Sequence, residues 1–113
     1  TNRLANFIAT HGPTLESALE RWLPLSKKAG AEQFNQALHY AVFPGGKRLR
    51  PMLTLIGARL AGGDSQHALP AACAMEFLHT SSLVLDDLPA MDDADLRRNR
   101  RTVHLVYGES TAC

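Results

Sequence analysis

The sequence predicts an all-α protein, and three observations support this prediction. Apolar residues recur every three or four positions in four successive segments, which is the spacing of one helix face. Prolines and glycines mark the breaks between these segments. No segment alternates apolar and polar residues over the length of a strand. With 113 residues, 45% hydrophobic and 20% charged, the chain has the composition of a soluble globular domain.

Four helices are expected, each bounded by proline or glycine, at about 14–23, 34–42, 50–61 and 65–87. The first follows Pro13, and Thr14 can cap it. The fourth is nearly apolar all round, which is typical of a helix buried at the centre of a bundle. Pro89 ends or kinks that helix. A polar stretch follows, and a last short helix is expected from Thr102.

The bulk properties also bear on location. The longest apolar run, Ala68–Met75, is far shorter than the roughly 18 residues that cross a bilayer, so no membrane span is expected. Cys73 and Cys113 show neither metal-ligand spacing nor a disulfide framework, which favours a reduced, cytoplasmic setting. The chain lacks an initiator Met and stops within an expected helix. We therefore expect residues 1–113 to be part of one longer domain.

An acidic cluster is the most informative feature of the chain. Five aspartates lie within ten residues at the end of the fourth helix: Asp86, Asp87, Asp92, Asp93 and Asp95. Charges this close repel unless a cation lies among them, and Mg²⁺ takes one or two carboxylates together with phosphate oxygens. Asp86 and Asp92 are too far apart to share a helix face, unless Pro89 forces a two-residue bulge. A solvated acidic helix end would also account for the cluster, but the helix dipole disfavours it.

Two basic groups accompany the acids. Four arginines follow the aspartates directly: Arg97, Arg98, Arg100 and Arg101. Beside metal-bound carboxylates they could grip the other side of a diphosphate, whereas alone they would indicate a surface or nucleic-acid patch. Lys47 and Arg50 lie near a helix start after two glycines and could converge on one anion. His79 lies two helical turns before Asp86. It could contact an anion, or it could be a packed core histidine.

Together these motifs resemble the trans-isoprenyl diphosphate synthases, the farnesyl and geranylgeranyl diphosphate synthase family. The resemblance is carried by GGKRLRP at Gly45–Pro51 and EFLHTSSLVLDDLPAMDDADLRR at Glu76–Arg98. It implies a helical bundle of the isoprenoid synthase type, with residues 1–113 as its N-terminal part. It also implies a Mg²⁺-dependent, homodimeric prenyltransferase that condenses isopentenyl diphosphate with an allylic diphosphate.

The resemblance assigns a role to each motif residue. Four residues would hold the diphosphate of isopentenyl diphosphate: Lys47, Arg50, His79 and Arg98. Asp86 and Asp92 would bind the Mg²⁺ ions that bridge to the allylic diphosphate, and Arg97 would contact that diphosphate. Asp87 and Asp93 would support them. The family's second aspartate-rich motif is absent from these residues, so the 113-residue chain alone is expected to be inactive.

The resemblance also bears on the product. Ser81 and Ser82 stand where an aromatic side chain accompanies the shorter farnesyl product, so a C20 geranylgeranyl product is favoured over C15. Asn99 and Arg101 replace the family's usual Gly and Pro, and Asn99 can keep a left-handed turn.

Two different functions are compatible with parts of this pattern. The chain could belong to a non-catalytic subunit of a heteromeric synthase, although intact Asp86, Asp92, Arg97 and Arg98 argue against it. It could also be an arginine-rich helical module for nucleic acid. The net charge of +1 counts against that function, because no global basic field surrounds the chain.

Overall fold

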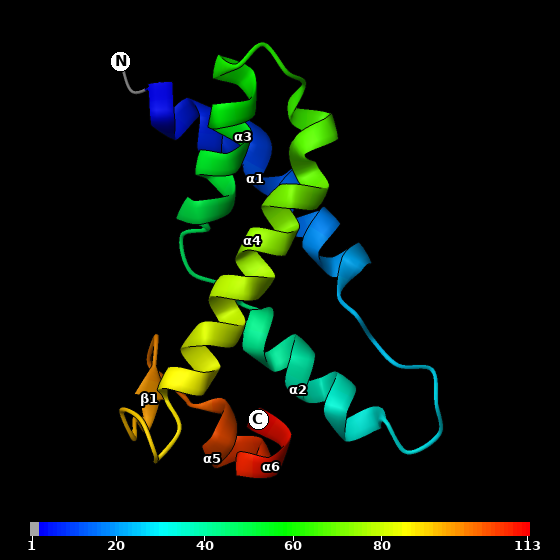
Figure 1. Cartoon of the computed structure of the whole chain (residues 1–113), viewed down its shortest axis with the longest axis vertical. Coiled ribbons are helices and arrows are strands. Elements are labelled where there is room, and N and C mark those ends of the chain that lie inside the picture. Colours follow the sequence, from blue (N-terminus) through cyan, green and yellow to red (C-terminus); the bar gives the residue numbers. More distant parts are fainter. Residues whose placement is uncertain (1–2) are drawn as a thin grey trace. The chain divides into compact units, whose positions relative to one another are not determined.

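A computed structural model describes residues 3–113 (Figure 1). These residues fall into two compact units. The first unit takes in residues 3–23 and 47–76, and the second takes in residues 24–46 and 77–113.

The described residues are mostly helical, as predicted. The helices are α1 (Arg3–Trp22), α2 (Glu32–Val42), α3 (Leu49–Leu60), α4 (Ser65–Asp86), α5 (Val103–Tyr107) and α6 (Glu109–Ala112). Two short strands, β1 (Leu96–Arg97) and β2 (Arg100–Arg101), pair in an antiparallel hairpin. The expected bounds of α2, α3 and α4 are confirmed within about two residues, because the prolines and glycines that mark them act locally. The short helix expected from Thr102 is also found, as α5.

The predicted start of the first helix is wrong. Helix α1 begins at Arg3 and contains Pro13, so it runs about ten residues further toward the N-terminus than expected. Proline removes one backbone donor and normally breaks a helix. The buried face formed by Leu15, Ala18 and Leu19 anchors α1 after the proline, and packing of an apolar face supplies most of the stability of a helix in a protein.

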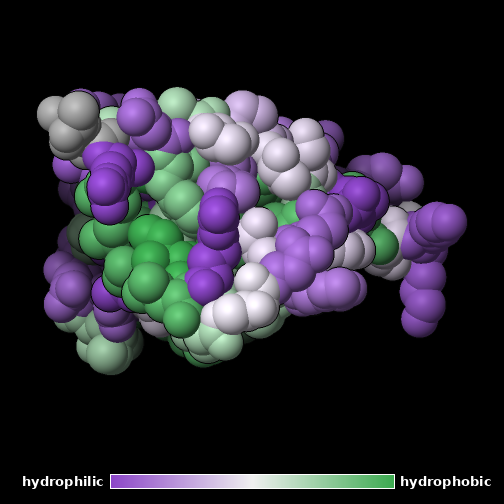
Figure 2. All heavy atoms as spheres, turned by 90° about the horizontal axis from the view of Figure 1, so that it is seen from above, coloured by the Kyte–Doolittle hydropathy of each residue, from purple (hydrophilic) through white to green (hydrophobic). Residues whose placement is uncertain are grey.

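The core of the first unit comes from α1, α3 and the first half of α4. Its fully buried side chains include Leu15, Leu19, Met52, Leu55 and Cys73. Burial raises the pKa of the Cys73 thiol to about 11, which marks how completely this site excludes water. Several large apolar side chains elsewhere in the chain remain exposed, and Figure 2 shows hydrophobic surface beside strongly hydrophilic residues.

Helix α4 has the predicted length but not the predicted burial. Met75, Leu78 and Leu85 are exposed, Leu78 at 67%, because nothing in the described chain packs over that side of the helix. By length and composition α4 could cross a membrane, although only 28% of its most apolar window is buried. Core helices of soluble proteins meet the same criterion, so the absence of a membrane span stays a prediction.

The hairpin in the second unit depends on a left-handed turn. Its two central residues, Arg98 and Asn99, have φ values of 51° and 61°. Positive φ at both positions is the signature of the tight turn that matches the twist of paired strands. The expectation that Asn99 keeps a left-handed conformation is confirmed. The hairpin itself was not predicted, because its strands are only two residues long and show no apolar–polar alternation.

Candidate active site

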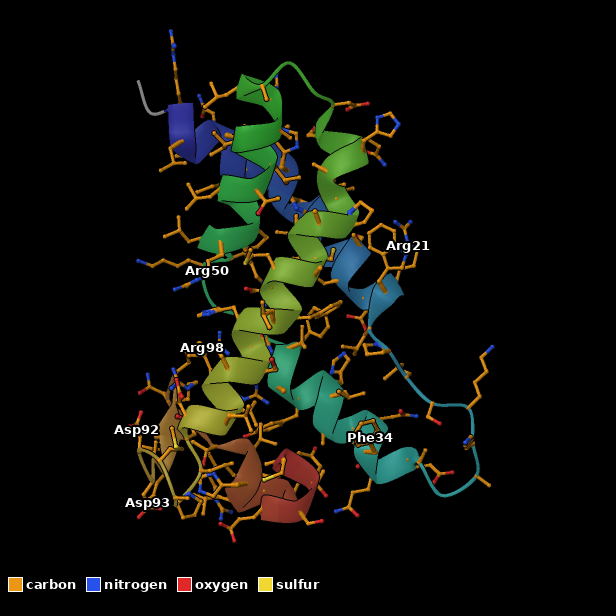
Figure 3. All side chains as sticks on the ribbon, in the orientation of Figure 1. Arg21, Phe34, Arg50, Asp92, Asp93 and Arg98 are labelled. Carbon is orange, nitrogen blue, oxygen red and sulfur yellow. The ribbon has the colours of Figure 1, made fainter. Side chains whose placement is uncertain are left out.

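The acidic segment folds back on the end of α4. The Asp92 N–H donates to the Asp86 carbonyl at 2.8 Å, and the Ala94 N–H donates to the Asp87 carbonyl at 3.1 Å. The first of these bonds spans six residues, whereas an α-helix spans four. The segment around Pro89 therefore forms a wide turn after the last residue of α4, not a continued helix face. Figure 3 shows Asp92 and Asp93 in this turn, beyond the last residues of α4.

The five aspartates do not share one environment. Asp86 and Asp92 are exposed, whereas only 4% of the Asp87 side chain is exposed. The Asp87 carboxylate accepts two hydrogen bonds from Arg97, from Nε at 2.7 Å and from Nη2 at 2.8 Å. This bidentate pair ties the end of α4 to β1 and raises the pKa of Arg97, chiefly through the Asp87 hydrogen bonds. Asp87 is thus committed to an ion pair inside the protein.

The four arginines likewise have different partners. Arg98 lies against Gly46, where an added Cβ would come within 2.9 Å of the Arg98 Nη1. Arg100 donates to the Phe43 carbonyl at 2.9 Å and stacks over the Tyr40 ring, with its guanidinium carbon 4.0 Å from the ring centroid. The Tyr40 hydroxyl donates to the backbone carbonyl of Arg101, the residue after Arg100. The arginine block therefore holds the second unit together as well as presenting positive charge.

A small cavity lies among these side chains. Its volume is about 30 Å³, and Thr80, Asp87, Arg97, Arg98 and Arg100 are among the residues that line it. Such a volume holds roughly one water molecule. This enclosed space is thus too small for a diphosphate.

The basic loop of the first unit consists of Lys47, Arg48, Leu49 and Arg50, and one of its cations is buried. Lys47 and Arg50 are exposed, but Arg48 is buried between two helices. Its Nε lies 2.8 Å from Glu16 of α1, and its Nη1 lies 2.5 Å from Glu76 of α4. Burial by itself lowers the pKa of Arg48, but the hydrogen bonds and charges of the two glutamates outweigh it, so the pKa is raised.

The remaining predicted residues lie on the second half of α4. His79 is half-buried, and Ser81 and Ser82 are exposed. The Ser81 hydroxyl donates to the Leu78 carbonyl at 2.8 Å, and the Ser82 hydroxyl donates to the His79 carbonyl at 2.6 Å. Both serines thus bond to their own helix and present only a small side chain to their surroundings.

The structure distributes the predicted residues over its two units. Lys47 and Arg50 belong to the first unit. The second unit holds His79, Ser81, Ser82, Asp86, Asp92, Arg97 and Arg98. Within residues 3–113, no three His, Cys, Asp or Glu side chains come close enough to hold a metal by themselves. A metal held by Asp86 and Asp92 would therefore need oxygen ligands from elsewhere.

Sequence reasoning missed the internal roles of Arg48, Glu76 and Asp87, although a signal for the two acids exists. Glu76 continues the buried stripe that begins with Leu69 and Ala72, at helical spacing. Asp87 stands two turns beyond buried Thr80. An acid on the buried face of a helix requires a cationic partner, so the periodicity alone could have marked both.

Comparison with known proteins agrees with these motifs. A family model described as polyprenyl synthetase matches residues 31–113. The chain is 41% identical over 112 residues to geranylgeranyl pyrophosphate synthase 6, mitochondrial, of Arabidopsis thaliana, covering 95% of this chain and 33% of the relative. It is 48% identical over 99 residues to the chloroplastic geranylgeranyl pyrophosphate synthase 9 of the same plant, covering 88% and 27%.

Solved structures give the same result. A geranyltransferase from Legionella pneumophila superposes with a TM-score of 0.85 at 40% identity, over 96% of this chain and 37% of that one. An FPP/GFPP synthase from Zymomonas mobilis superposes with a TM-score of 0.83 at 32% identity, over 96% and 40%. The chain spans about a third of the length of the curated relatives that it matches. With most of its residues matched by the family model and its fold shared with these enzymes, the chain belongs to the polyprenyl synthetase family.

Proposed function

We propose that the full-length protein is a Mg²⁺-dependent prenyltransferase that condenses isopentenyl diphosphate with an allylic diphosphate. The observation that carries this proposal is the turn after α4. It joins Asp86 and Asp92 by a backbone hydrogen bond and leaves both carboxylates exposed. The neighbouring Asp87 is taken up by Arg97, whereas the two exposed acids form no such bidentate pair in the described chain. Their placement suits the binding of a cation.

The donor set fits magnesium rather than a metal enclosed by protein. Mg²⁺ is commonly held by one or two carboxylates, with substrate phosphates and water completing its coordination. Two carboxylates, Asp86 and Asp92, are the number that this mode requires from the protein. When bound, Mg²⁺ would stabilise the negative charge that develops on the leaving diphosphate of the allylic substrate.

The arginines would act on the same diphosphates. Arg97 uses Nε and Nη2 on Asp87, which leaves Nη1 to donate to the allylic diphosphate. Asp87 is then a support for Arg97 instead of a metal ligand. Arg98 lies against Gly46, the residue directly before Lys47 in the sequence. The resemblance of the motifs supports the assignment of Lys47, Arg50, His79 and Arg98 to the diphosphate of isopentenyl diphosphate.

We further propose a geranylgeranyl (C20) product. Several relatives bear the name geranylgeranyl pyrophosphate synthase, and Ser81 and Ser82 leave room for a long prenyl tail near the metal site. The main competing product is C15 farnesyl diphosphate, because a similar solved structure is called an FPP/GFPP synthase. A homodimer and a cytoplasmic location complete the proposal, the latter resting on two unpaired cysteines.

A non-catalytic subunit and a nucleic-acid module find less support. One relative is the large subunit of a heterodimeric geranylgeranyl pyrophosphate synthase, but a non-catalytic subunit would have no need for exposed Asp86 and Asp92. A nucleic-acid module needs an open basic face. Here Arg97 is paired with Asp87 and Arg100 is held by Phe43 and Tyr40, so the arginine block does not form such a face.

The proposal is tested by the reaction itself. The full-length protein would be incubated with Mg²⁺, labelled isopentenyl diphosphate and one allylic diphosphate of five, ten or fifteen carbons. Chromatography of the dephosphorylated products then gives their chain length. Incorporation of label into C20 material supports the whole proposal. Incorporation that stops at C15 retains the prenyltransferase and rejects the product, and no incorporation with any allylic substrate rejects the function.

A further inference from the structure

Arg48 lies between the two cations of the basic loop but has a different environment. Only 5% of its side chain is exposed, and the same is true of its partner Glu76. The flanking residues Lys47 and Arg50 are both exposed. The sequence marks Lys47 and Arg50 as anion contacts but does not indicate that Arg48 is buried. The difference between them arises from the two glutamates that surround Arg48.

The buried guanidinium joins three helices of the first unit. Arg48 precedes α3 and its carbonyl accepts the Met52 N–H at 3.1 Å, so its backbone forms the start of that helix. Its side chain donates to Glu16 on α1 and to Glu76 on α4. One end of α3 is thus fixed to both neighbouring helices through a single residue.

The backbone conformation at Arg48 is unusual and depends on these side-chain contacts. Its φ is 56°, in the left-handed region that a non-glycine residue adopts only with strain. A charged side chain is also costly to bury unless its hydrogen bonds are satisfied. The two glutamates satisfy this side chain and thereby hold the backbone in its strained conformation.

We propose that Arg48 is the positioning residue that fixes Lys47 and Arg50 in the orientation that binds the diphosphate of isopentenyl diphosphate. This inference rests on the proposed function. Lys47 is the residue before the fixed backbone and Arg50 lies in the first turn after it, so the direction of both follows from the conformation at Arg48. Arg48 itself has no proposed contact with the substrate, because its side chain is 5% exposed and its Nε, Nη1 and Nη2 all donate to the two glutamates.

Lysine cannot take over this role. An arginine presents five N–H groups in a planar fork, whereas the lysine ammonium is a single point with three donors. Glu16 and Glu76 lie on different helices and accept from different nitrogens of the fork. Arg48→Lys therefore keeps the charge and loses at least one of the two connections. The matched control is Arg59→Lys, the same substitution at an exposed position of α3.

The test measures steady-state kinetics of the full-length protein with both substrates. For Arg48→Lys we expect the KM for isopentenyl diphosphate to rise about tenfold, because a cation displaced by about 1 Å binds its anion poorly. The KM for the allylic diphosphate and kcat should stay within about twofold, and Arg59→Lys should match wild type in all three. A purely structural role would lower the amount of active enzyme and leave both KM values unchanged, which would overturn the inference.

A second variant covers the case in which Arg48→Lys does not fold. Glu16→Gln removes the half-exposed partner, whose side chain is 44% exposed, and keeps the buried pair with Glu76. It should raise the KM for isopentenyl diphosphate about threefold, and an unchanged KM refutes positioning. If wild type is inactive, the proposed function fails and the inference falls with it. If wild type is active and the variants are unaffected, only the inference fails.

Discussion

Exchange of Asp87 for asparagine separates the structural acid from the exposed ones. Asn has almost the same shape as Asp but carries an NH₂ group in place of one carboxylate oxygen. In Asp87→Asn, Arg97 can keep one of its two hydrogen bonds, at 2.7 and 2.8 Å in the wild type. The second Arg97 N–H would then face another donor. The variant thus removes the negative charge and one hydrogen bond without creating a cavity.

The magnitude follows from burial. Removing one partner of a fully buried ion pair costs about 3 to 5 kcal/mol, because the remaining charge is left without compensation. Asp87 is 4% exposed, but 34% of the Arg97 side chain is exposed, so water can stabilise part of the remaining charge. We therefore expect Asp87→Asn to lower the free energy of unfolding by about 2 kcal/mol.

The assay is urea unfolding of the full-length protein, followed by far-ultraviolet circular dichroism. Asp86→Asn is the matched control, since it is the same substitution at the adjacent, exposed residue. It should change the free energy of unfolding by no more than about 0.5 kcal/mol. Equal losses in the two variants, or no loss in Asp87→Asn, would refute the reasoning. Asp87 would then become a candidate metal ligand beside Asp86 and Asp92.

The remaining predictions concern substrate binding, product length and thiol burial. Lys47→Ala should raise the KM for isopentenyl diphosphate about tenfold or more with little change in kcat, and initial rates that show an unchanged KM would contradict its role. Ser81→Tyr should shift the main product from C20 to C15, because an aromatic ring fills space that the last isoprene unit needs; a wild-type enzyme that already stops at C15 would contradict this. Because the pKa of Cys73 is about 11, roughly a thousandth of the thiol is ionised at about pH 8. Peptide mass spectrometry should find Cys73 unmodified by N-ethylmaleimide in the native protein and modified after unfolding, whereas rapid native labelling would show that the core is open.

Local signals made much of the fold predictable. The bounds of α2 and α3 coincide with a proline–glycine break and a glycine pair, whose effects require no distant partner. The start of α1 could not be predicted in this way, because Pro13 is a local signal for a break. The buried residues that follow it, such as Leu15 and Leu19, act through contacts with other helices.

In the candidate site, too, local features could be predicted from the sequence and contacts between distant residues could not. The return of Asp92 to Asp86 follows from Pro89 and the short spacing, both of which are local. The pairing of Arg48 with Glu16 joins residues 32 positions apart, and its pairing with Glu76 joins residues 28 apart. A sequence shows which residues carry charge. Which of them are free to bind a ligand and which form internal ion pairs depends on contacts in the folded chain.

The central claim is that exposed Asp86 and Asp92 hold the magnesium on which condensation depends. The most direct measurement compares kcat of the full-length wild type with Asp86→Ala and Asp92→Ala over a range of Mg²⁺ concentrations, with a chelator as the metal-free limit. We predict that wild type requires Mg²⁺ and that each variant loses on the order of 10²-fold or more in kcat at saturating Mg²⁺. Wild-type turnover that persists in the chelator, or near-normal turnover of Asp86→Ala, would contradict it.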